Sequence, residues 1–506
     1  MESYFVVYSA ISVAIIYAIT KHLLNRIRNL PPSPALSLPI VGHLYLFKKP
    51  LHRSLAKISD RYGPIVYLRF GSRAVILVSS PSAIEECLTK QNDVAFANRP
   101  RLLGGKYSGY NHTSLVWAPY GEHWRNQRRI ASAEILSSHR LQLLSEVRAD
   151  EVCALVRRLL KLSTESEDQV VEMKSAIFGV TMNNMMRMIS GKRCYGGDEE
   201  DKEARRFQET VEQSSRMGGA TNLGDFLPIL RWLGVVGSED KLKKLKEKKD
   251  EFVQGLIDEH RRMDKEGSLS DGKKAAMIDV LLSMQKQDPD YYTDEMIKSF
   301  LLSLFSAGTD TTVGTIEWAL SLLLSHPNAL NKAQCEIDER VGHDRLLEES
   351  DNLPYLRCII NESLRMYPVA PLAVPHESWS DCNVRGHFVP RGTMMLYNIW
   401  AVHNDPKIWE SPRQFKPERF AGLEGNRVGF KFLPFGVGRR SCPGEGLATR
   451  LLGLTLGSLI QCFEWSSVCR EALDMREGGG ISLVKLEPLQ AKCSPRPSMK
   501  NLLSQI

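Results

Sequence analysis

The chain has 506 residues, of which 43% are hydrophobic and 25% charged, so it is long and apolar enough to bury a large core. Its net charge of +7 is modest and mixed along the chain, which argues against a nucleic-acid-binding protein and leaves room for an anionic partner or a membrane surface. The ten cysteines lack the spacing of a disulfide framework, so we expect reduced thiols in a body that faces the cytosol. Length alone would suggest two to four domains, but no long linker interrupts the chain after residue 40. We therefore expect one catalytic domain over residues 41–506.

The N-terminal segment predicts a membrane anchor. Residues from Ser3 to Thr20 carry no charge and would form a helix of about 27 Å, close to the thickness of an endoplasmic-reticulum bilayer. Lys21, Arg26 and Arg28 follow, so the positive-inside rule places the N-terminus in the lumen and the remainder in the cytosol. No convincing cleavage site is present, so we expect a retained transmembrane signal anchor over residues 1–21. A basic hinge over residues 22–40 comes next, in which prolines forbid helix: Pro31, Pro32, Pro34 and Pro39.

Strand patterns are confined to two parts of the chain. β-Branched residues are concentrated from Ile65 to Phe70 and from Ala74 to Val78, and the intervening Gly71-Ser72-Arg73 predicts a hairpin. A further strand-like region lies between about Pro371 and Leu396. The remaining patterns are helical, so the sequence predicts a mainly α fold with a small β subdomain.

The stretch 118–129 predicts a helix that starts at Pro119. Trp124 and Arg128 are four residues apart, so an indole N–H and a guanidinium lie on one face of this helix. Both groups are pure hydrogen-bond donors and suit a pair of carboxylates. Taken alone, the spacing is better explained by a core tryptophan beside a surface arginine.

The longest helical pattern begins at the capping residue Thr293 and ends at His326, before a proline. The segment SAGTDTT, residues 306–312, places a glycine and three threonines in its centre, where they cost helix stability. Activation of dioxygen is a chemical reason for this choice: Thr311 can hydrogen-bond an oxygen or a water, and Asp310 can relay protons. A threonine-rich kink with a purely structural purpose is the alternative.

Glu362 and Arg365 are three residues apart on a helix that stops before Pro368. Such a pair is usually a weak surface ion pair and alone means little. Arg419 lies in a later loop, and His376 lies in the strand-like region, where an ordinary strand histidine is the alternative to a ligand contact.

The stretch FGVGRRSCPG, residues 435–444, places a lone cysteine, Cys442, after a glycine-rich turn and before a helical pattern. The first amides of a helix stabilise a thiolate, which is the form of sulfur that a haem iron needs as an axial ligand. An inert buried cysteine is the alternative. Its neighbours suit the haem interpretation, because two glycines allow positive φ, an arginine can reach a propionate, an aromatic ring can cover the sulfur and a third glycine lets the helix approach the ring. These residues are Gly436, Gly438, Arg440, Phe435 and Gly444.

This stretch resembles the haem-thiolate signature of the cytochrome P-450 family, FxxGxRxCxG, with every fixed position filled. The chain is similar to that family in its other motifs as well, namely WxxxR from Trp124, AGxDT from Ala307, ExxR from Glu362 and PERF from Pro417. The resemblance implies the cytochrome P-450 haem-thiolate fold behind the N-terminal transmembrane helix.

The resemblance also implies the roles of the motif residues. Haem b would take Cys442 as its axial thiolate, and Asp310 and Thr311 would deliver protons to bound oxygen. The residues implied at the haem propionates are Trp124, Arg128, His376 and Arg440. A buried structural triad that holds the cysteine loop is implied for Glu362, Arg365 and Arg419.

The implied activity is an NADPH- and O2-dependent monooxygenation, with electrons supplied by NADPH-cytochrome P-450 reductase at the endoplasmic-reticulum membrane. Arg125 and Arg129 are candidates for the docking face of that reductase, with a solvated surface as the equally good interpretation. The stretch 96–130 resembles plant microsomal enzymes related to isoflavone hydroxylases and to lignan-, indole glucosinolate- and triterpenoid-modifying relatives.

The substrate is expected to be a hydrophobic plant specialised metabolite, with a flavonoid, isoflavonoid or lignan as the first hypothesis. A terpenoid is the second, because an apolar wall from Leu301, Leu304, Val369, Leu372 and Val374 would suit it equally well. A haem-thiolate isomerase or dehydratase that needs no reductase is the third, and the intact Asp310-Thr311 pair argues against it; a non-catalytic haem-binding protein is weaker still. The loops expected to decide the substrate are 101–119, 207–226 and 478–484.

Overall fold

The computed structural model describes residues 27–165, 169–194, 222–232, 238–266, 276–423, 428–468 and 473–506, together with residues 20, 206, 207, 209, 210 and 213. No helix within these residues is long and apolar enough to cross a membrane. All of the predicted anchor except Thr20, and residues 22–26 of the predicted hinge, lie outside the described residues, so both the anchor and the hinge stay predictions.

The described chain is mainly helical with small sheets, as predicted. Before the central helix the helices are Leu51–Tyr62 (α2), Pro81–Leu88 (α3), Lys90–Ala95 (α4), Leu103–Tyr107 (α5), Glu122–Ile130 (α6), Ser138–Leu143 (α7), Ser145–Glu165 (α8), Met173–Ser190 (α9), Leu223–Phe226 (α11), Pro228–Trp232 (α12), Ser238–Lys265 (α13) and Met277–Gln287 (α14). The central helix is Asp294–Leu324 (α15), and after it come Pro327–Arg340 (α16), Pro354–Met366 (α17), Ile399–His403 (α18), Glu445–Cys462 (α19) and Lys500–Leu503 (α20).

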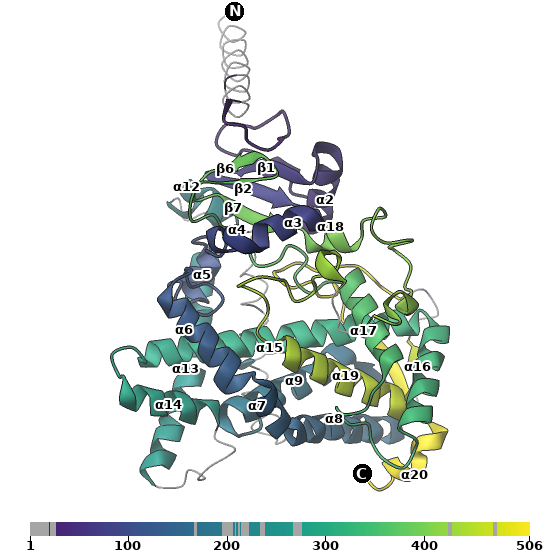
Figure 1. Cartoon of the computed structure of the whole chain (residues 1–506). Helices are drawn as coiled ribbons and strands as arrows, with labels where there is room; N and C mark the ends of the chain where they lie inside the picture. The colour runs from purple at the N-terminus through teal and green to yellow at the C-terminus, as the bar shows by residue number, and fades with distance from the viewer. Residues whose placement is uncertain are drawn as a thin grey trace, which may run out of the picture.

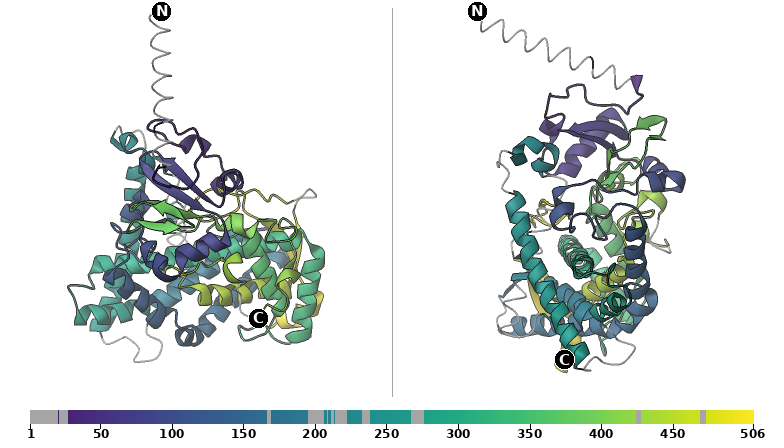
Figure 2. Two further views of the ribbon diagram at one scale, coloured as in Figure 1. Left: turned by 45° about the horizontal axis from the view of Figure 1, so that its top comes forward. Right: turned by 90° about the vertical axis from the view of Figure 1, so that its left-hand side faces the viewer.

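The central helix α15 follows the sequence prediction at both ends. The Thr293 side chain caps it by accepting a hydrogen bond from the Met296 amide at 3.2 Å, and two acidic residues follow in the first turn. The helix ends at Leu324, and Pro327 begins the next one. Helices α9, α13, α16, α17 and α19 pack around it, so it runs through the middle of the helical layer (Figure 1) and is seen end-on near the centre of the right-hand view in Figure 2.

The largest sheet has the strand order β1-β2-β7-β4 and lies at one end of the molecule, above the helical layer in Figure 1. Its strands are Ile65–Phe70 (β1), Arg73–Val78 (β2), Met394–Tyr397 (β7) and His376–Glu377 (β4). The predicted hairpin forms with Ile65 opposite Val78, and it begins its second strand one residue earlier than predicted. Both faces of β1 are buried: Tyr67 packs into one hydrophobic cluster, and Val66 and Leu68 pack into another.

Two smaller sheets complete the fold. One pairs Cys382–Val384 (β5) with His387–Val389 (β6), inside the predicted strand-like region. The other has the order β3-β9-β8 and was not predicted; its strands are Val170–Glu172 (β3), Gln490–Pro495 (β9) and Phe463–Ser467 (β8).

Helix α6 starts at Glu122, three residues later than predicted. The residues before it are held in other contacts: the Tyr120 amide donates to Asn98 Oδ1 at 3.3 Å, and the Ala118 carbonyl accepts from Arg440 at 2.6 Å. These tertiary contacts take the place of the first helical turn.

Candidate functional site

The cysteine loop between residues 433 and 444 is fixed by its own backbone. The Cys442 amide donates to the Phe435 carbonyl at 2.8 Å, which closes the loop. Gly436 and Gly438 adopt φ values of +69° and +76°, the left-handed region that favours glycine, as predicted. A Cβ on Gly438 would also lie 2.8 Å from the Leu88 carbonyl oxygen, so a side chain is excluded there by space as well as by φ.

Cys442 lies two residues before Gly444, the N-cap of α19. Burial raises the pKa of the Cys442 thiol, while hydrogen bonds from the Gly444 and Glu445 amides and the charge of Arg128 oppose that effect. Cys442 has exposed surface, yet it lies deep enough in the molecule that burial has the largest effect on its pKa. Its sulfur therefore faces an internal space rather than packing as an inert core thiol, and the cap amides point the way a thiolate needs.

Two arginines at the loop, Arg440 and Arg128, bind backbone carbonyls and pair with no carboxylate of the described residues. Arg440 donates from Nε to the Ala97 carbonyl at 2.8 Å and from Nη2 to the Ala118 carbonyl at 2.6 Å. Arg128 donates to the Ser441 carbonyl at 2.6 Å. Burial lowers the pKa of both guanidinium groups, to about 8 for Arg440, where Arg99 and Arg128 add to the effect.

A third arginine, Arg99, joins this cluster and was not singled out from the sequence. It is buried, and it donates to the carbonyls of Val116 (3.1 Å), Val374 (2.8 Å) and Pro375 (2.9 Å). Burial lowers the pKa of Arg99 to about 9. Its sequence context, an arginine before a proline, carries no signal for this role.

This cluster fits an anionic ligand. Among the described residues no carboxylate pairs with Arg99, Arg128 or Arg440, and Arg440 Nη1 is buried without a hydrogen-bond partner. Buried charges are normally paired, and buried donors are normally satisfied. A ligand that brings carboxylates into the space beside Cys442 would supply the missing counter-charges and the missing hydrogen-bond acceptors. Haem, with its two propionates, is such a ligand.

Replacing Arg440 with methionine tests that fit. The variant keeps an unbranched apolar stem and removes the charge and the donors, so we expect haem affinity to fall by about 10–100-fold, the usual cost of losing a supporting partner. The measurement is the haem content per mole of purified protein during titration. Arg439→Met is the matched control, because Arg439 is exposed and pairs with Asp93. Equal haem affinity in the two variants would contradict the assignment of Arg440.

Trp124 and His376 each already donate a hydrogen bond to a backbone carbonyl. The Trp124 indole N–H donates to the Leu115 carbonyl at 3.1 Å, and the ring lies 4.3 Å from the Arg440 guanidinium carbon. His376 Nδ1 lies 2.6 Å from the Phe96 carbonyl, and burial holds the pKa of this histidine well below its ordinary value, so the ring is neutral with its proton on Nδ1. Contact of either residue with a propionate stays a prediction, and for His376 it would require a proton on Nε2 as well.

The centre of α15 keeps accessible surface at the predicted motif. Ala307 is exposed and Thr311 partly exposed, although most of this helix is buried. The Thr311 hydroxyl donates to the Ala307 carbonyl at 2.6 Å, which leaves its oxygen free to accept from a ligand or water. Asp310 is buried beside it.

Close packing between helices explains why residue 308 is a glycine, which was not predicted from the sequence. A Cβ at this position would lie 2.7 Å from the Met185 sulfur on α9. The glycine therefore allows close packing of α9 against α15, on top of any role in making room for oxygen.

The structure brings Glu362, Arg365 and Arg419 together. Arg365 donates to both Glu362 oxygens at 2.7 and 2.9 Å, and Arg419 donates to Glu362 Oε1 at 3.0 Å. The Glu362 and Arg365 side chains are fully buried. This is a buried ionic cluster rather than a surface pair, and its role in holding the cysteine loop stays a prediction.

His403 connects this cluster to the cysteine loop and was missed from the sequence. Arg365 donates to the His403 carbonyl at 2.7 Å, and the Leu433 amide donates to His403 Nε2 at 2.8 Å. Burial lowers the pKa of His403 to about 3, so the ring stays neutral and its Nε2 can accept. The backbone just before Phe435 is thereby tied to the triad.

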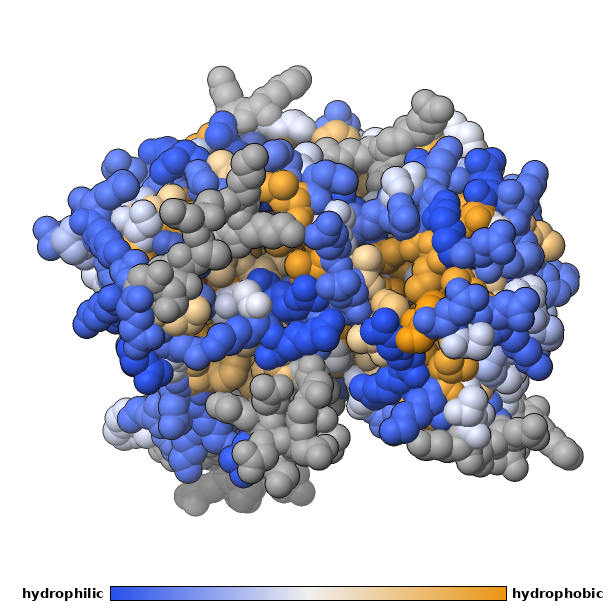
Figure 3. All heavy atoms as spheres, turned by 90° about the horizontal axis from the view of Figure 1, so that it is seen from below, coloured by the Kyte–Doolittle hydropathy of each residue, from blue (hydrophilic) through white to orange (hydrophobic). Residues whose placement is uncertain are grey.

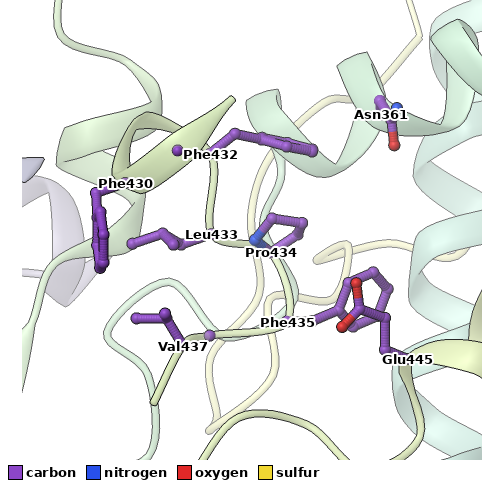
Figure 4. A pocket seen from close by; sticks show the side chains of 10 residues that line it. Asn361, Phe430, Phe432, Leu433, Pro434, Phe435, Val437 and Glu445 are labelled. Atoms are coloured by element: carbon purple, nitrogen blue, oxygen red, sulfur yellow. The ribbon is translucent and has the colours of Figure 1, made fainter. Parts of the chain in front are cut away.

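A small cavity of about 160 Å³ lies behind the loop. Phe432, Pro434 and Phe435 line it between Asn361 on α17 and Glu445 at the start of α19 (Figure 4). The Phe435 side chain thus packs on the α17 and α19 side of the loop.

The residues proposed for the apolar wall separate into two groups. Leu301 has no exposed surface and Leu304 is buried, so both belong to the hydrophobic core. Val369, Leu372 and Val374 keep partial exposure and remain candidates for contact with substrate. Arg125 and Arg129 are exposed on α6, whereas the partly exposed Arg128 between them contacts the cysteine loop.

Comparison with protein families gives one match over most of the chain. A family model described as Cytochrome P450 matches residues 31–492. Among solved structures, a zebra fish cytochrome P450 with progesterone superposes with a TM-score of 0.74 at 28% identity, over 89% of this chain and 100% of that one.

Two curated plant proteins are more similar in sequence. The (+)-piperitol/(+)-sesamin synthase of Sesamum radiatum is 47% identical, over 94% of this chain and 93% of its own. An isoflavone 2'-hydroxylase of Glycyrrhiza echinata is 45% identical, over 95% of each chain. The resemblance to plant enzymes of isoflavone and lignan metabolism, inferred from the stretch 96–130, is thereby confirmed.

Proposed function

Because the chain belongs to the cytochrome P450 family and is a monooxygenase with haem-thiolate cofactor, we propose that Cys442 supplies the thiolate and that the reaction depends on NADPH and O2. The observation that carries the proposal is the accessible Cys442 beside the buried Arg99 and the partly buried Arg128 and Arg440, for which the described residues provide no acidic partner. Arg99, Arg128 and Arg440 would hold the propionates, with Phe435, Gly438 and Gly444 shaping the loop around the sulfur.

Bound haem supplies the transfer of electrons to dioxygen and the cleavage of its bond. This chain's own residues hold the reacting partners and move protons. The Thr311 oxygen can accept a hydrogen bond from a water while its own O–H still donates to the Ala307 carbonyl. Asp310, buried one residue earlier, would relay protons to that water. The intact pair favours oxygen activation over a reductase-independent isomerisation or dehydration.

Replacing Thr311 with alanine is expected to separate NADPH use from product formation. The variant loses the hydroxyl that orders the proton donor, so the fraction of consumed NADPH that ends in product should fall by at least about tenfold. Both quantities are measured in the same reaction. Thr312→Ala is the matched control, because Thr312 is buried and its hydroxyl donates to the Gly308 carbonyl. Unchanged coupling in Thr311→Ala would remove Thr311 from this role.

The enzyme oxidises a hydrophobic plant specialised metabolite, and we propose a flavonoid, isoflavonoid or lignan. Support comes from relatives named for an isoflavone and for (+)-piperitol and (+)-sesamin, each similar over more than nine-tenths of the chain. The partly exposed Val369, Leu372 and Val374 offer the apolar contacts that such rings need.

Electrons would come from NADPH-cytochrome P450 reductase. Arg125 and Arg129 lie exposed on α6, whose Arg128 contacts the cysteine loop, so an acidic partner that docks there would stand close to Cys442. This placement supports α6 as part of the docking face.

We place the protein at the endoplasmic-reticulum membrane, anchored by residues 1–21 and the hinge over 22–40. Exposed apolar side chains flank the β1–β2 turn on two sides: Leu36, Leu38 and Ile40 (78% exposed) before it, and Ile229 and Trp232 (85% exposed) on α12. Gly42 pairs with Phe70, and the Ser72 amide donates to the Phe226 carbonyl, so both groups belong to this end of the molecule. The opposite end is largely hydrophilic, with apolar surface mainly in recesses (Figure 3). This polarity suits a body that rests one end on the bilayer.

Product mass spectrometry tests the proposed substrate. Microsomes that contain this chain and a plant reductase receive NADPH and one of two pools, the first of flavonoids, isoflavonoids and lignans, the second of triterpenoids and other terpenoids. An NADPH-dependent gain of one oxygen in the first pool is expected. A gain in the second pool alone would replace the aromatic substrate with a terpenoid. Conversion that needs no NADPH would favour the isomerase or dehydratase.

A further inference from the structure

Residues 476–486 form a hairpin that reaches from the surface to the central helix. Its stem pairs Glu477 with Lys485, and the Gly478 amide donates to the Val484 carbonyl at 2.8 Å. At its inner end, Val484 Cγ1 lies 3.8 Å from the position of a Cβ on Gly314, three residues after Thr311 on α15. The inner end of the hairpin therefore lies within one helical turn of the proposed oxygen site.

The returning arm of the hairpin is held by the helical layer. The Leu483 amide donates to the Val369 carbonyl at 2.7 Å, and the Trp318 indole donates to the Leu483 carbonyl at 2.9 Å. Trp318 in turn stacks on Tyr367 with ring centroids 3.8 Å apart. These bonds fix Leu483 against α15 and the segment after α17.

The outgoing arm has a different support. The Glu477 side chain is 1% exposed, and its carboxylate accepts from Arg53 Nη2 at 2.6 Å and Nε at 3.0 Å. His52 Nε2 lies 3.1 Å from Glu477 Oε2, close enough for an ion pair but without hydrogen-bond geometry. Both partners come from α2, beside the sheet. The Arg53 guanidinium lies 5.0 Å from the Trp400 ring centre, so the partner is itself held in place. Burial tends to raise the pKa of Glu477, but its two partners outweigh it and keep this pKa below its ordinary value.

Three consecutive glycines, Gly478, Gly479 and Gly480, follow Glu477, and glycine backbones have little intrinsic preference for one conformation. The direction of the tip must therefore be set at its two ends. One end is Leu483, and the other is the ion pair of Glu477 with α2. Ile481 and Ser482, both partly exposed, lie between them.

We propose that Glu477 is a positioning residue for substrate recognition, which acts through Arg53 and His52 to hold the 478–482 tip against the site on α15. The inference rests on the proposed function, because it assigns the tip to the wall of the haem-bearing site. Glu477 itself does not contact substrate; it determines how rigidly the 478–482 tip is held.

Ligand size gives a test that needs no knowledge of the substrate. Imidazole is small enough to bind haem iron without touching the hairpin, whereas clotrimazole carries three phenyl rings that need a wall. In Glu477→Gln holoprotein, we expect the Kd of clotrimazole to rise by roughly tenfold, equivalent to about 1.4 kcal/mol, with the Kd of imidazole unchanged. Arg53→Met should reproduce this shift, and the double variant should add little to either, since the two residues act as one unit.

Arg476→Gln is the matched control. Arg476 is the adjacent residue in the same hairpin, but its ion pair with Asp474 is on the surface, so both azoles should bind as they do in the wild type. Hydrogen exchange of the intact holoprotein gives a second readout: the Gly478 amide should exchange about tenfold faster in Glu477→Gln and not in Arg476→Gln.

Each outcome decides between explanations. Equal shifts for both azoles, or unchanged exchange at Gly478 in Glu477→Gln, would overturn the positioning role. A wild-type protein that binds haem but gives no spectral change with imidazole would overturn the proposed function instead, and hydrogen exchange would still report on the contact between Glu477 and Arg53.

Discussion

Replacing Cys442 with alanine is expected to abolish product formation and the red-shifted Soret band of the reduced, carbon monoxide-bound protein. No other side chain in the loop between residues 433 and 444 can supply a thiolate. Activity should fall to the level of protein without haem. The two measurements are turnover with NADPH and the carbon monoxide difference spectrum.

The matched control for Cys442 is Cys335→Ala. Cys335 is a free, exposed thiol on α16, so its loss should leave both turnover and the spectrum unchanged. Ordinary turnover by the Cys442 variant would refute the assignment of the axial ligand.

Replacing Glu362 with glutamine is expected to be the most destabilising of these changes. The variant keeps the shape of the side chain but leaves the fully buried Arg365 with no counter-charge, which typically costs about 3–5 kcal/mol. A loss of that size is a large part of the stability of most domains, which is about 5–15 kcal/mol. Little correctly folded haem protein should accumulate, as measured by the carbon monoxide spectrum per mole of chain and by thermal unfolding.

Lys332→Met provides the comparison for Glu362. It removes the ion pair with Glu418, whose two side chains are both more than half exposed, and such pairs contribute about 0–1 kcal/mol. Similar stability of the Glu362 and Lys332 variants would show that the buried cluster does not hold the cysteine loop.

Local features of this fold were predictable from the sequence because their causes are local. The β1–β2 hairpin follows from β-branched runs around a glycine turn, and the start of α15 follows from the Thr293 cap. The positive φ of Gly436 and Gly438 follows in the same way from the glycine-rich turn before Cys442. In each case a few neighbouring residues determine the conformation.

Features that depend on distant pairs were not predictable. Strands β3 and β9 pair Val170 with Lys492, and three-residue β3 carries too little pattern to be recognised alone. Arg99 and His403 acquire their contacts from segments hundreds and tens of residues away, respectively. The hydrogen bond from the Trp124 indole N–H to the Leu115 carbonyl likewise depends on how the loop before Trp124 folds, although the two residues are near neighbours in sequence.

Isotopically labelled dioxygen tests the central claim most directly. The enzyme, its reductase, NADPH and a converted substrate are incubated under heavy-isotope oxygen in ordinary water, and the product is examined by mass spectrometry. Incorporation of one heavy oxygen atom per product, absent from Cys442→Ala, is the result expected of a monooxygenase built around this thiolate. A product that carries no heavy oxygen, or one that forms equally well without Cys442, would contradict the account.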